Sequence, residues 1–152
     1  MAERYVLDAL EVTLGASFIS WAALPIAASA KPDGIDTEHR IAVEVFARIG
    51  KLKSAQAHKV RADLFKLAYL RKLLGPEWRT IFCFVDQSAS ASLLGRSWTA
   101  DAARAFGVEI LVQDLPENVR LQVIAAQDRQ NMAKVRQVEP QFTVTDTQDL
   151  QA

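Results

Sequence analysis

The spacing of apolar and polar positions divides the chain into helices and strands. Some segments place apolar residues every three or four positions, which is typical of helices packed on one side, and others are short runs of bulky residues, which is typical of strands. The predicted order is helix, strand, strand, strand, helix, strand, helix, strand, helix. The elements with assigned bounds are a helix over 3–14, a strand over 17–26, a strand that starts at Ile41 and ends before Gly50, a helix over 54–74, a strand over 80–85, a helix over 97–106, a strand over 108–112 and a helix over 116–135.

The order of these elements predicts the fold class. Closely spaced strands in the first half of the chain call for hairpins, whereas strands that alternate with helices in the second half call for parallel pairing. We therefore expect an α/β fold in which helices flank a mixed central β-sheet with an αβββαβ core. A single domain is expected over 1–138. The remainder, 139–152, is polar and contains Pro140, and is expected to be a flexible tail.

The strand that starts at Ile41 carries a carboxylate where an apolar residue is expected. Side chains alternate along a strand, so Ala42, Glu44 and Phe46 share one face, and both faces are largely apolar. An interior strand is predicted. Because an ionised carboxylate buried without a partner is costly, Glu44 needs a cation, a hydrogen-bond network or a raised pKa.

The helix over 54–74 offers partners for Glu44. One stripe of this helix is polar near its start and apolar near its end, as a purely solvated face would not be; its members are Gln56, Lys59, Asp63, Lys66, Leu67, Leu70 and Leu74. We infer that Lys59 and Asp63 point inward, close to Glu44. The alternative is a structural Glu–Lys pair accompanied by ordinary surface charges.

A segment of turn chemistry precedes the Glu44 strand. Pro32-Asp33-Gly34 is followed two residues later by Asp36, so the chain is predicted to reverse between residues 30 and 40. Asp33 is equally well explained as a turn former alone.

Composition limits the classes of function. The formal net charge of the 152 residues is zero, so no global basic field indicates nucleic acid, yet 48–72 contains eight basic residues and a single acid, Asp63. The lone cysteine, Cys83, lies in an apolar run and is expected to pack in the core of a protein from a reducing cytoplasm. The apolar segment 14–30 is interrupted by Pro25 and is too short for a membrane span, so no membrane association is expected.

The αβββαβ layout, with an aspartate before the third strand and a glutamate within it, resembles the PD-(D/E)XK nuclease superfamily, whose fold is called restriction endonuclease-like. The matching residues are Pro32-Asp33, with Asp36 as a competing candidate, and Glu44. Glu11 would correspond to the first-helix acid of that superfamily, although a solvated helix acid is the simpler explanation. The resemblance covers about residues 5–112. The signature lysine two positions after the acid is replaced by Phe46, and Lys59 on the following helix is the expected substitute.

The resemblance implies a metal-dependent nuclease that hydrolyses phosphodiester bonds of DNA. Asp33 or Asp36 together with Glu44 would bind Mg²⁺, or alternatively Mn²⁺, because hard carboxylate oxygens suit these ions and the bound metal acidifies its water. Lys59 would position the water or stabilise charge, and Gln56 or Asp63 would orient it. The residues expected to contact the DNA backbone are Lys51, Lys53, Arg61 and Lys66. A chain this small is expected to act as a homodimer or in a larger complex.

Two alternatives remain open from the sequence. The first is a catalytically inactive module that keeps the fold and uses its basic helix to bind nucleic acid or a protein partner. The second is a small-ligand α/β domain built on Asp86, which follows an apolar strand and precedes a loop of small polar residues.

Overall fold

The structure of the chain, a computed structural model, describes residues 2–25 and 29–138. The predicted tail, 139–152, lies outside the described residues. The elements, in chain order, are α1 (Ala2–Leu14), the 3-10 helix η1 (Trp21–Ala23), β1 (Gly34–Asp36), β2 (Ile41–Phe46), α2 (Ser54–Leu74), β3 (Arg79–Phe84), α3 (Gln87–Leu94), α4 (Trp98–Ala105), β4 (Val108–Val112) and α5 (Glu117–Val138).

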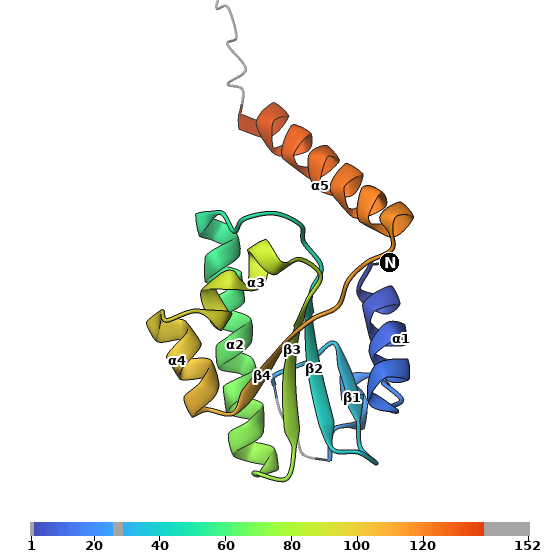
Figure 1. The fold of residues 1–152 in the computed structure, drawn as a ribbon, viewed down its shortest axis with the longest axis vertical. Coiled ribbons are helices and arrows are strands. Elements are labelled where there is room, and N and C mark those ends of the chain that lie inside the picture. Colours follow the sequence, from blue (N-terminus) through green and yellow to red (C-terminus); the bar gives the residue numbers. More distant parts are fainter. Residues whose placement is uncertain (1, 26–28, 139–152) are drawn as a thin grey trace, which may run out of the picture.

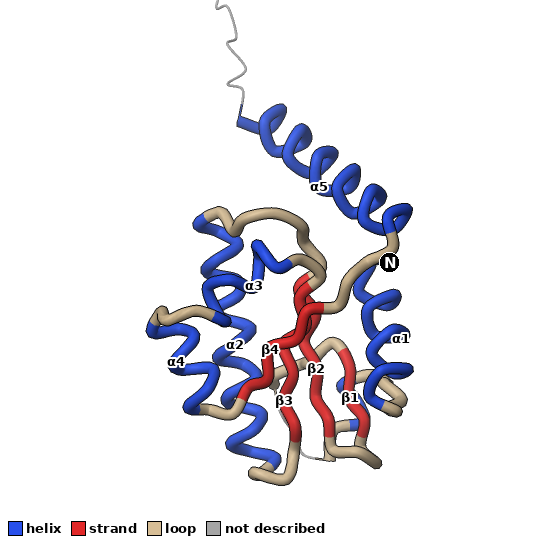
Figure 2. Tube along the Cα trace, in the orientation of Figure 1, coloured by secondary structure: helices blue, strands red, loops and turns tan. Residues whose placement is uncertain are grey.

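The strands form one mixed sheet in the order β1-β2-β3-β4 (Figures 1 and 2). β1 pairs antiparallel with β2, with Gly34 opposite Val43. β2 and β3 are parallel, with Glu44 opposite Phe82, and β3 and β4 are also parallel. The crossover from β2 to β3 is α2, and the crossover from β3 to β4 contains α3 and α4. The predicted α/β class with a mixed sheet is confirmed.

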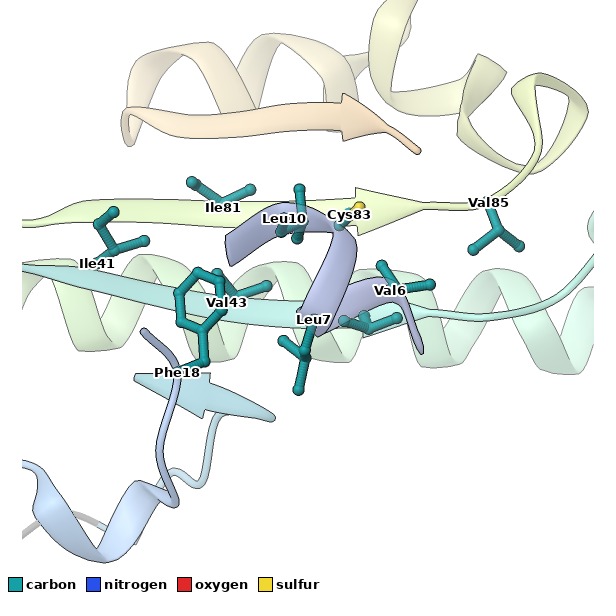
Figure 3. Packing of buried hydrophobic residues seen from close by; sticks show 10 residues of the cluster. Val6, Leu7, Leu10, Phe18, Ile41, Val43, Ile81, Cys83 and Val85 are labelled. Atoms are coloured by element: carbon teal, nitrogen blue, oxygen red, sulfur yellow. The ribbon is translucent and has the colours of Figure 1, made fainter. Parts of the chain in front are cut away.

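Helix α1 covers one face of the sheet. Val6, Leu7 and Leu10 pack there against the side chains of β2 and β3 that point toward α1 (Figure 3). These side chains belong to Ile41, Val43, Val45, Ile81 and Cys83. The alternation in β2 therefore matches the predicted faces, with Glu44 and Phe46 directed to the other side.

Helices α2, α3 and α4 cover the opposite face (Figure 1). Phe46, Phe82 and Phe84 meet there, and the rings of Phe82 and Phe84 stack with centroids 4.7 Å apart. Val60, Leu64 and Leu67 of α2 close this second core. Glu44 thus lies on the face of the sheet that α2, α3 and α4 cover.

The segment predicted as the first strand takes another form. Residue Ile19 makes only an isolated antiparallel bridge with Ile35, and the chain then turns into η1, whose start is capped by the Ser20 hydroxyl. Ile26, the last residue of the predicted strand, lies outside the described residues. Within the described part of the chain, two strands precede α2, where the αβββαβ layout expects three.

The predicted turn at Pro32-Asp33-Gly34 is the start of a strand. Residues 34–36 form β1, and the chain reverses three residues later, at 37–40, where Arg40 adopts a left-handed φ of 56°. The turn chemistry of Pro-Asp-Gly was outweighed by pairing with β2 on one side and with Ile19 on the other. In the second half, the small polar run after Asp86 forms α3, where the sequence suggested a loop.

The remaining elements lie close to their predicted positions. The bounds of α2 match those predicted, and Gly75 ends the helix with a left-handed φ of 98°. α5 begins after Pro116 and lies beyond the carboxyl ends of the parallel strands (Figure 1). Among the described helices, none has the length and apolar character that crossing a bilayer requires.

Candidate functional site

The β1–β2 hairpin brings Asp33 beside Glu44. Gly34 pairs with Val43 in antiparallel register, so the preceding residue, Asp33, lies across from Glu44. The Asp33 carboxylate also accepts a hydrogen bond of 2.8 Å from the backbone N–H of Val45. Asp33 and Glu44 are therefore held together by strand pairing and by the hydrogen bond from Asp33 to the residue after Glu44 in β2.

Glu44 is almost completely buried, with 3% of its surface exposed. The ammonium of Lys66 on α2 lies 2.8 Å from its Oε1. Its second oxygen, Oε2, is buried and has no hydrogen-bond partner among the described residues. A buried carboxylate oxygen without a donor is costly, so a proton or a cation bound at this atom would lower that cost.

The ammonium of Lys66 lies among oxygens from three segments. Besides Glu44 it contacts the carbonyl of Lys31 at 3.3 Å and Oδ1 of Asp63 at 3.5 Å. Oδ2 of Asp63 binds Lys59 at 2.7 Å. We call Asp33, Glu44, Asp63 and Lys66 the carboxylate cluster. It contains three acids and one cation, Lys66, whose ammonium already contacts three oxygens.

The electrostatics of the carboxylate cluster raise the pKa of Glu44 to about 7, from an ordinary 4.5. Burial is the largest cause, the hydrogen bond from Lys66 opposes it, and the negative charges of Asp33 and Asp63 add to it. Burial alone would lower the pKa of Lys66, but the bond to Glu44 and the charges of all three acids raise it above its ordinary value. A proton therefore binds readily to Glu44 near neutral pH, and a cation would compete with it.

The cation that contacts Glu44 is Lys66, where the sequence predicted Lys59. Residues 47–53 carry the start of α2 past the end of β2, so Lys59 lies near the strand end and its side chain is 59% exposed. Lys66 lies seven residues, about 10 Å, farther along the helix, level with the middle of β2. The signal was present in the sequence, because Lys66 belongs to the same inward stripe, but it was assigned to the DNA backbone. Asp63 points inward as predicted.

Asp36 is on the other face of the sheet from Glu44 and does not join the carboxylate cluster. Its carboxylate accepts hydrogen bonds from the backbone N–H groups of Ser17 and His39 and contacts the His39 ring at 2.7 Å. Burial would raise the pKa of Asp36, but these hydrogen bonds and the His39 charge lower it to about 2. Asp36 therefore anchors the hairpin turn, and Asp33 is the aspartate next to Glu44.

Two supporting residues also have structural roles. Glu11 of α1 accepts a hydrogen bond of 2.8 Å from the N–H of Phe18 and one of 3.3 Å from Arg4, which ties the helix to the chain that follows it. The side chain of Gln56 accepts from the N–H of Lys53 and so closes the start of α2. Neither contacts Glu44.

The residues expected to bind DNA divide into two groups. Lys51 and Lys53 are exposed in the loop before α2, whereas Arg61 is half-buried and contacts His58 at 3.0 Å. Lys66 is engaged in the carboxylate cluster.

Asp86, the residue on which a small-ligand domain would depend, accepts from the N–H of Gly50 at 2.8 Å and lies 3.5 Å from Arg120 of α5, so it joins three segments.

Two hollows adjoin the carboxylate cluster. Asp33 lines one of about 360 Å³ together with Arg4 and Trp21. Val45 and Lys59 line another of about 540 Å³. Glu3 borders both hollows, so they form neighbouring parts of one surface.

The described residues contain no group of three or more His, Cys, Asp or Glu side chains arranged to hold a metal ion. The residues that would hold a metal ion here are Glu44, through its unpartnered Oε2, and Asp33, across the strand pair from it. A pair suffices for Mg²⁺, which characteristically takes one or two carboxylates and completes its shell with water and substrate phosphate.

Comparison of the chain with protein-family models, with curated proteins and with solved structures found no match.

Proposed function

We propose that the protein is a metal-dependent nuclease that hydrolyses phosphodiester bonds of DNA, with a variant of the PD-(D/E)XK site. The observation that carries the proposal is the placement of Asp33 beside Glu44 in a β-hairpin, with a lysine 2.8 Å from Glu44 and a buried carboxylate oxygen left without a donor. This combination of two acids and one lysine is the one that the superfamily's signature requires, with the lysine supplied by α2.

Each residue of the carboxylate cluster has a defined part in this proposal. Asp33 and Glu44 would bind Mg²⁺ or Mn²⁺, which when bound supplies charge stabilisation and an acidified water. The ammonium of Lys66 lies 2.8 Å from Glu44, so its positive charge would stabilise a phosphate bound next to Glu44. Asp63, whose Oδ1 lies 3.5 Å from the ammonium of Lys66, would help to orient it.

The raised pKa of Glu44 is consistent with a cation site. Burial, with a smaller contribution from the charges of Asp33 and Asp63, raises the pKa of Glu44 to about 7, and a divalent ion would replace the proton that Glu44 holds below that pH. Activity should therefore rise with pH through the neutral range, as Glu44 becomes available to the metal.

The test is cleavage of supercoiled plasmid in the presence of Mg²⁺ or Mn²⁺, with EDTA as the metal-free control. Glu44→Gln and Asp33→Asn should each lower the nicking rate on the order of a hundredfold or more, since each removes a charged oxygen ligand of the metal that would stabilise the reacting phosphate. Glu38→Gln, an exposed acid in the same hairpin, should cleave as the wild type does. Thermal melts establish that the variants fold. Wild-type rates in Glu44→Gln and Asp33→Asn would refute the proposal.

A second candidate is a nuclease-fold module that binds nucleic acid without cutting it. It is favoured by the position of Lys66, whose ammonium lies within 3.5 Å of three oxygens. In this candidate the positive charge of Lys66 takes the place of a bound metal ion. This candidate predicts DNA binding that is unchanged by EDTA and no nicking in either metal. In both cases we propose DNA as the partner, bound by a homodimer of the chain or by a larger protein complex that contains it.

A further inference from the structure

The larger of the two hollows beside the carboxylate cluster has walls from three parts of the chain. One wall is the end of β2 and the loop after it, one is the start of α2, and one is α5, which lies beyond the carboxyl ends of the strands (Figure 1). We call it the basic hollow. The charged residues that line it are Glu3, Arg48, Lys53, Lys59 and Lys134.

The charge in the basic hollow is unbalanced. Of its four cations, only Lys59 forms an ion pair, with Asp63, within the described part of the chain. Arg48, Lys53 and Lys134 have no carboxylate within ion-pair distance among those same residues, and Glu3 is the single acid in the wall. Like charges gathered around a cavity of about 540 Å³ repel one another and attract an anion.

Arg48 adds a donor without an acceptor. Its Nε is buried and has no hydrogen-bond partner in the described structure, while its terminal nitrogen reaches Gln130 of α5 at only 3.4 Å. The free-energy cost of a buried charged donor without an acceptor is larger than the stabilisation that a neutral hydrogen bond provides. A phosphate presents several oxygens in the geometry that a guanidinium binds best.

Helix α5 is fixed where it completes this wall. The side chain of Gln127 binds the backbone of Ile49 twice, accepting from its N–H at 2.8 Å and donating to its carbonyl at 3.1 Å. Asn131 and Lys134 are four and seven residues farther along and so lie on the same side of the helix. Met132 and Val135 lie on other sides of the helix and do not line the hollow. α5 thus directs its polar side to the hollow.

The hollow adjoins the site of the proposed cleavage. Val45, which lines it, follows Glu44 and donates its N–H to Asp33. The pair of Lys59 with Asp63 leads directly to Lys66 and Glu44. Since Glu3 also borders the hollow that contains Asp33 and Trp21, the surface suits an elongated ligand better than a single small anion.

We infer that the basic hollow binds a phosphate of the DNA strand next to the one at the carboxylate cluster, and that α5 contributes to this subsite through Lys134. The inference rests on the proposed function for the nature of the ligand. It assigns α5 a part in substrate binding through residues outside the 5–112 region that resembles the nuclease superfamily.

The test measures binding without cleavage. A fluorescein-labelled DNA duplex is titrated with protein in EDTA at several salt concentrations, and affinity is followed by anisotropy. Lys53→Gln/Lys134→Gln should weaken binding at low salt and flatten the log–log salt slope by about 2, one for each phosphate-directed lysine. The control, Arg96→Gln/Arg129→Gln, removes the same charge from exposed positions outside the hollow and should leave the slope unchanged.

Equal effects of the two double variants, or no effect of either, would overturn the subsite. Failure of the proposed function is a separate outcome. If Lys53→Gln/Lys134→Gln loses affinity while the wild type never nicks plasmid, the subsite stands and the cleavage proposal fails. If the wild type cleaves in a metal-dependent way and Lys53→Gln/Lys134→Gln binds and cleaves as it does, the cleavage proposal stands and the subsite fails.

Discussion

Glu44 is a carboxylic acid in an environment that disfavours its charged form. It lies in the middle of a strand, against aromatic rings on its own face and beside two further acids. Lys66 compensates one oxygen only. Such a group makes both stability and ligand binding depend on pH.

The first prediction concerns the free energy of unfolding. The pKa of Glu44 is raised in the folded state to about 7, so its contribution is fully present below its unfolded value near 4.5 and is lost as pH rises through 7. The loss amounts to about 3 kcal/mol at most. Urea unfolding at pH 5 and pH 8 should show a smaller pH dependence in Glu44→Gln than in the wild type. His39, whose pKa is also raised, titrates in both proteins and cancels in the comparison. Parallel pH profiles would contradict this prediction.

The second prediction separates the two lysines of α2. Lys66→Met removes the partner of a buried carboxylate and should cost about 3 kcal/mol of stability at pH 8. At pH 5, where Glu44 is protonated, the cost should shrink to about 1 kcal/mol. Lys59→Met removes an ion pair with a largely exposed lysine and should cost under about 1 kcal/mol at either pH. Equal costs for the two variants, measured by urea titration, would place the partner of Glu44 elsewhere.

At the scale of elements, Arg71 near the end of α2 adds hydrogen bonds to the segments before β3 and β4. Arg71 donates to the carbonyl of Gly107, at 3.0 Å, and to that of Trp78, at 3.3 Å. These bonds join the end of α2 to the start of β3 and to the turn before β4. The turn needs glycine, because Gly107 has a φ of 66° and a Cβ there would lie 2.7 Å from the Arg71 guanidinium.

The third prediction compares two glycines with nearly equal φ. Gly15 has a φ of 63° and nothing within 4 Å of an added Cβ, so Gly15→Ala should cost only the strain of the left-handed conformation, about 1 kcal/mol. Gly107→Ala has the same strain and also displaces Arg71 from its carbonyls, which should add about 1–2 kcal/mol. Thermal or urea unfolding of both variants measures the difference, and equal losses would show that the Arg71 bonds contribute nothing.

Elements were predicted from the sequence where local pattern and tertiary context agree. The stripe of α2 and the apolar run of β4 identified both elements correctly, since Leu67 and Leu70 of the stripe are buried and β4 pairs with β3 along its length. β1 was missed because its three residues have turn chemistry and become a strand only through their neighbours. α3 was missed because small residues such as Ala89 and Ser90, both buried, give little periodic signal.

The carboxylate cluster was predicted only in part for a related reason. Glu44 could be named because it is an acid in an apolar strand, Asp63 because it lies on the inward stripe of α2, and Asp33 because Pro32-Asp33 matches the motif of the nuclease superfamily. The choice between Asp33 and Asp36, and between Lys59 and Lys66, depends on strand register and on how far α2 begins beyond β2. Neither quantity is encoded within a short window of sequence.

At the scale of the whole molecule, the single cysteine reports on the integrity of the fold. Cys83 lies in β3, which has a paired strand on each side, and is fully buried. Burial raises the pKa of its thiol to about 12, although a backbone hydrogen bond from Gln113 opposes the shift. Both the access and the thiolate that a disulfide reagent requires are therefore absent from the native state.

The fourth prediction follows from this position. Labelling of Cys83 by an aromatic disulfide should be at least on the order of a thousandfold slower in native buffer than in denaturant, because it requires opening of the central sheet. Its rate should follow global unfolding as urea is added. Rapid labelling that is insensitive to urea would show that β3 opens locally, and the sheet would then be a poor platform for a fixed pair of acids.

The hairpin that carries Asp33 and Glu44 also limits how the length of the chain can vary. Strand side chains alternate, so one residue inserted between Asp33 and Asp36 would send the Asp33 carboxylate to the side covered by α1. The same insertion within 37–40 would only enlarge an exposed bend. Insertions and deletions compatible with a working pair of acids are therefore confined to that bend.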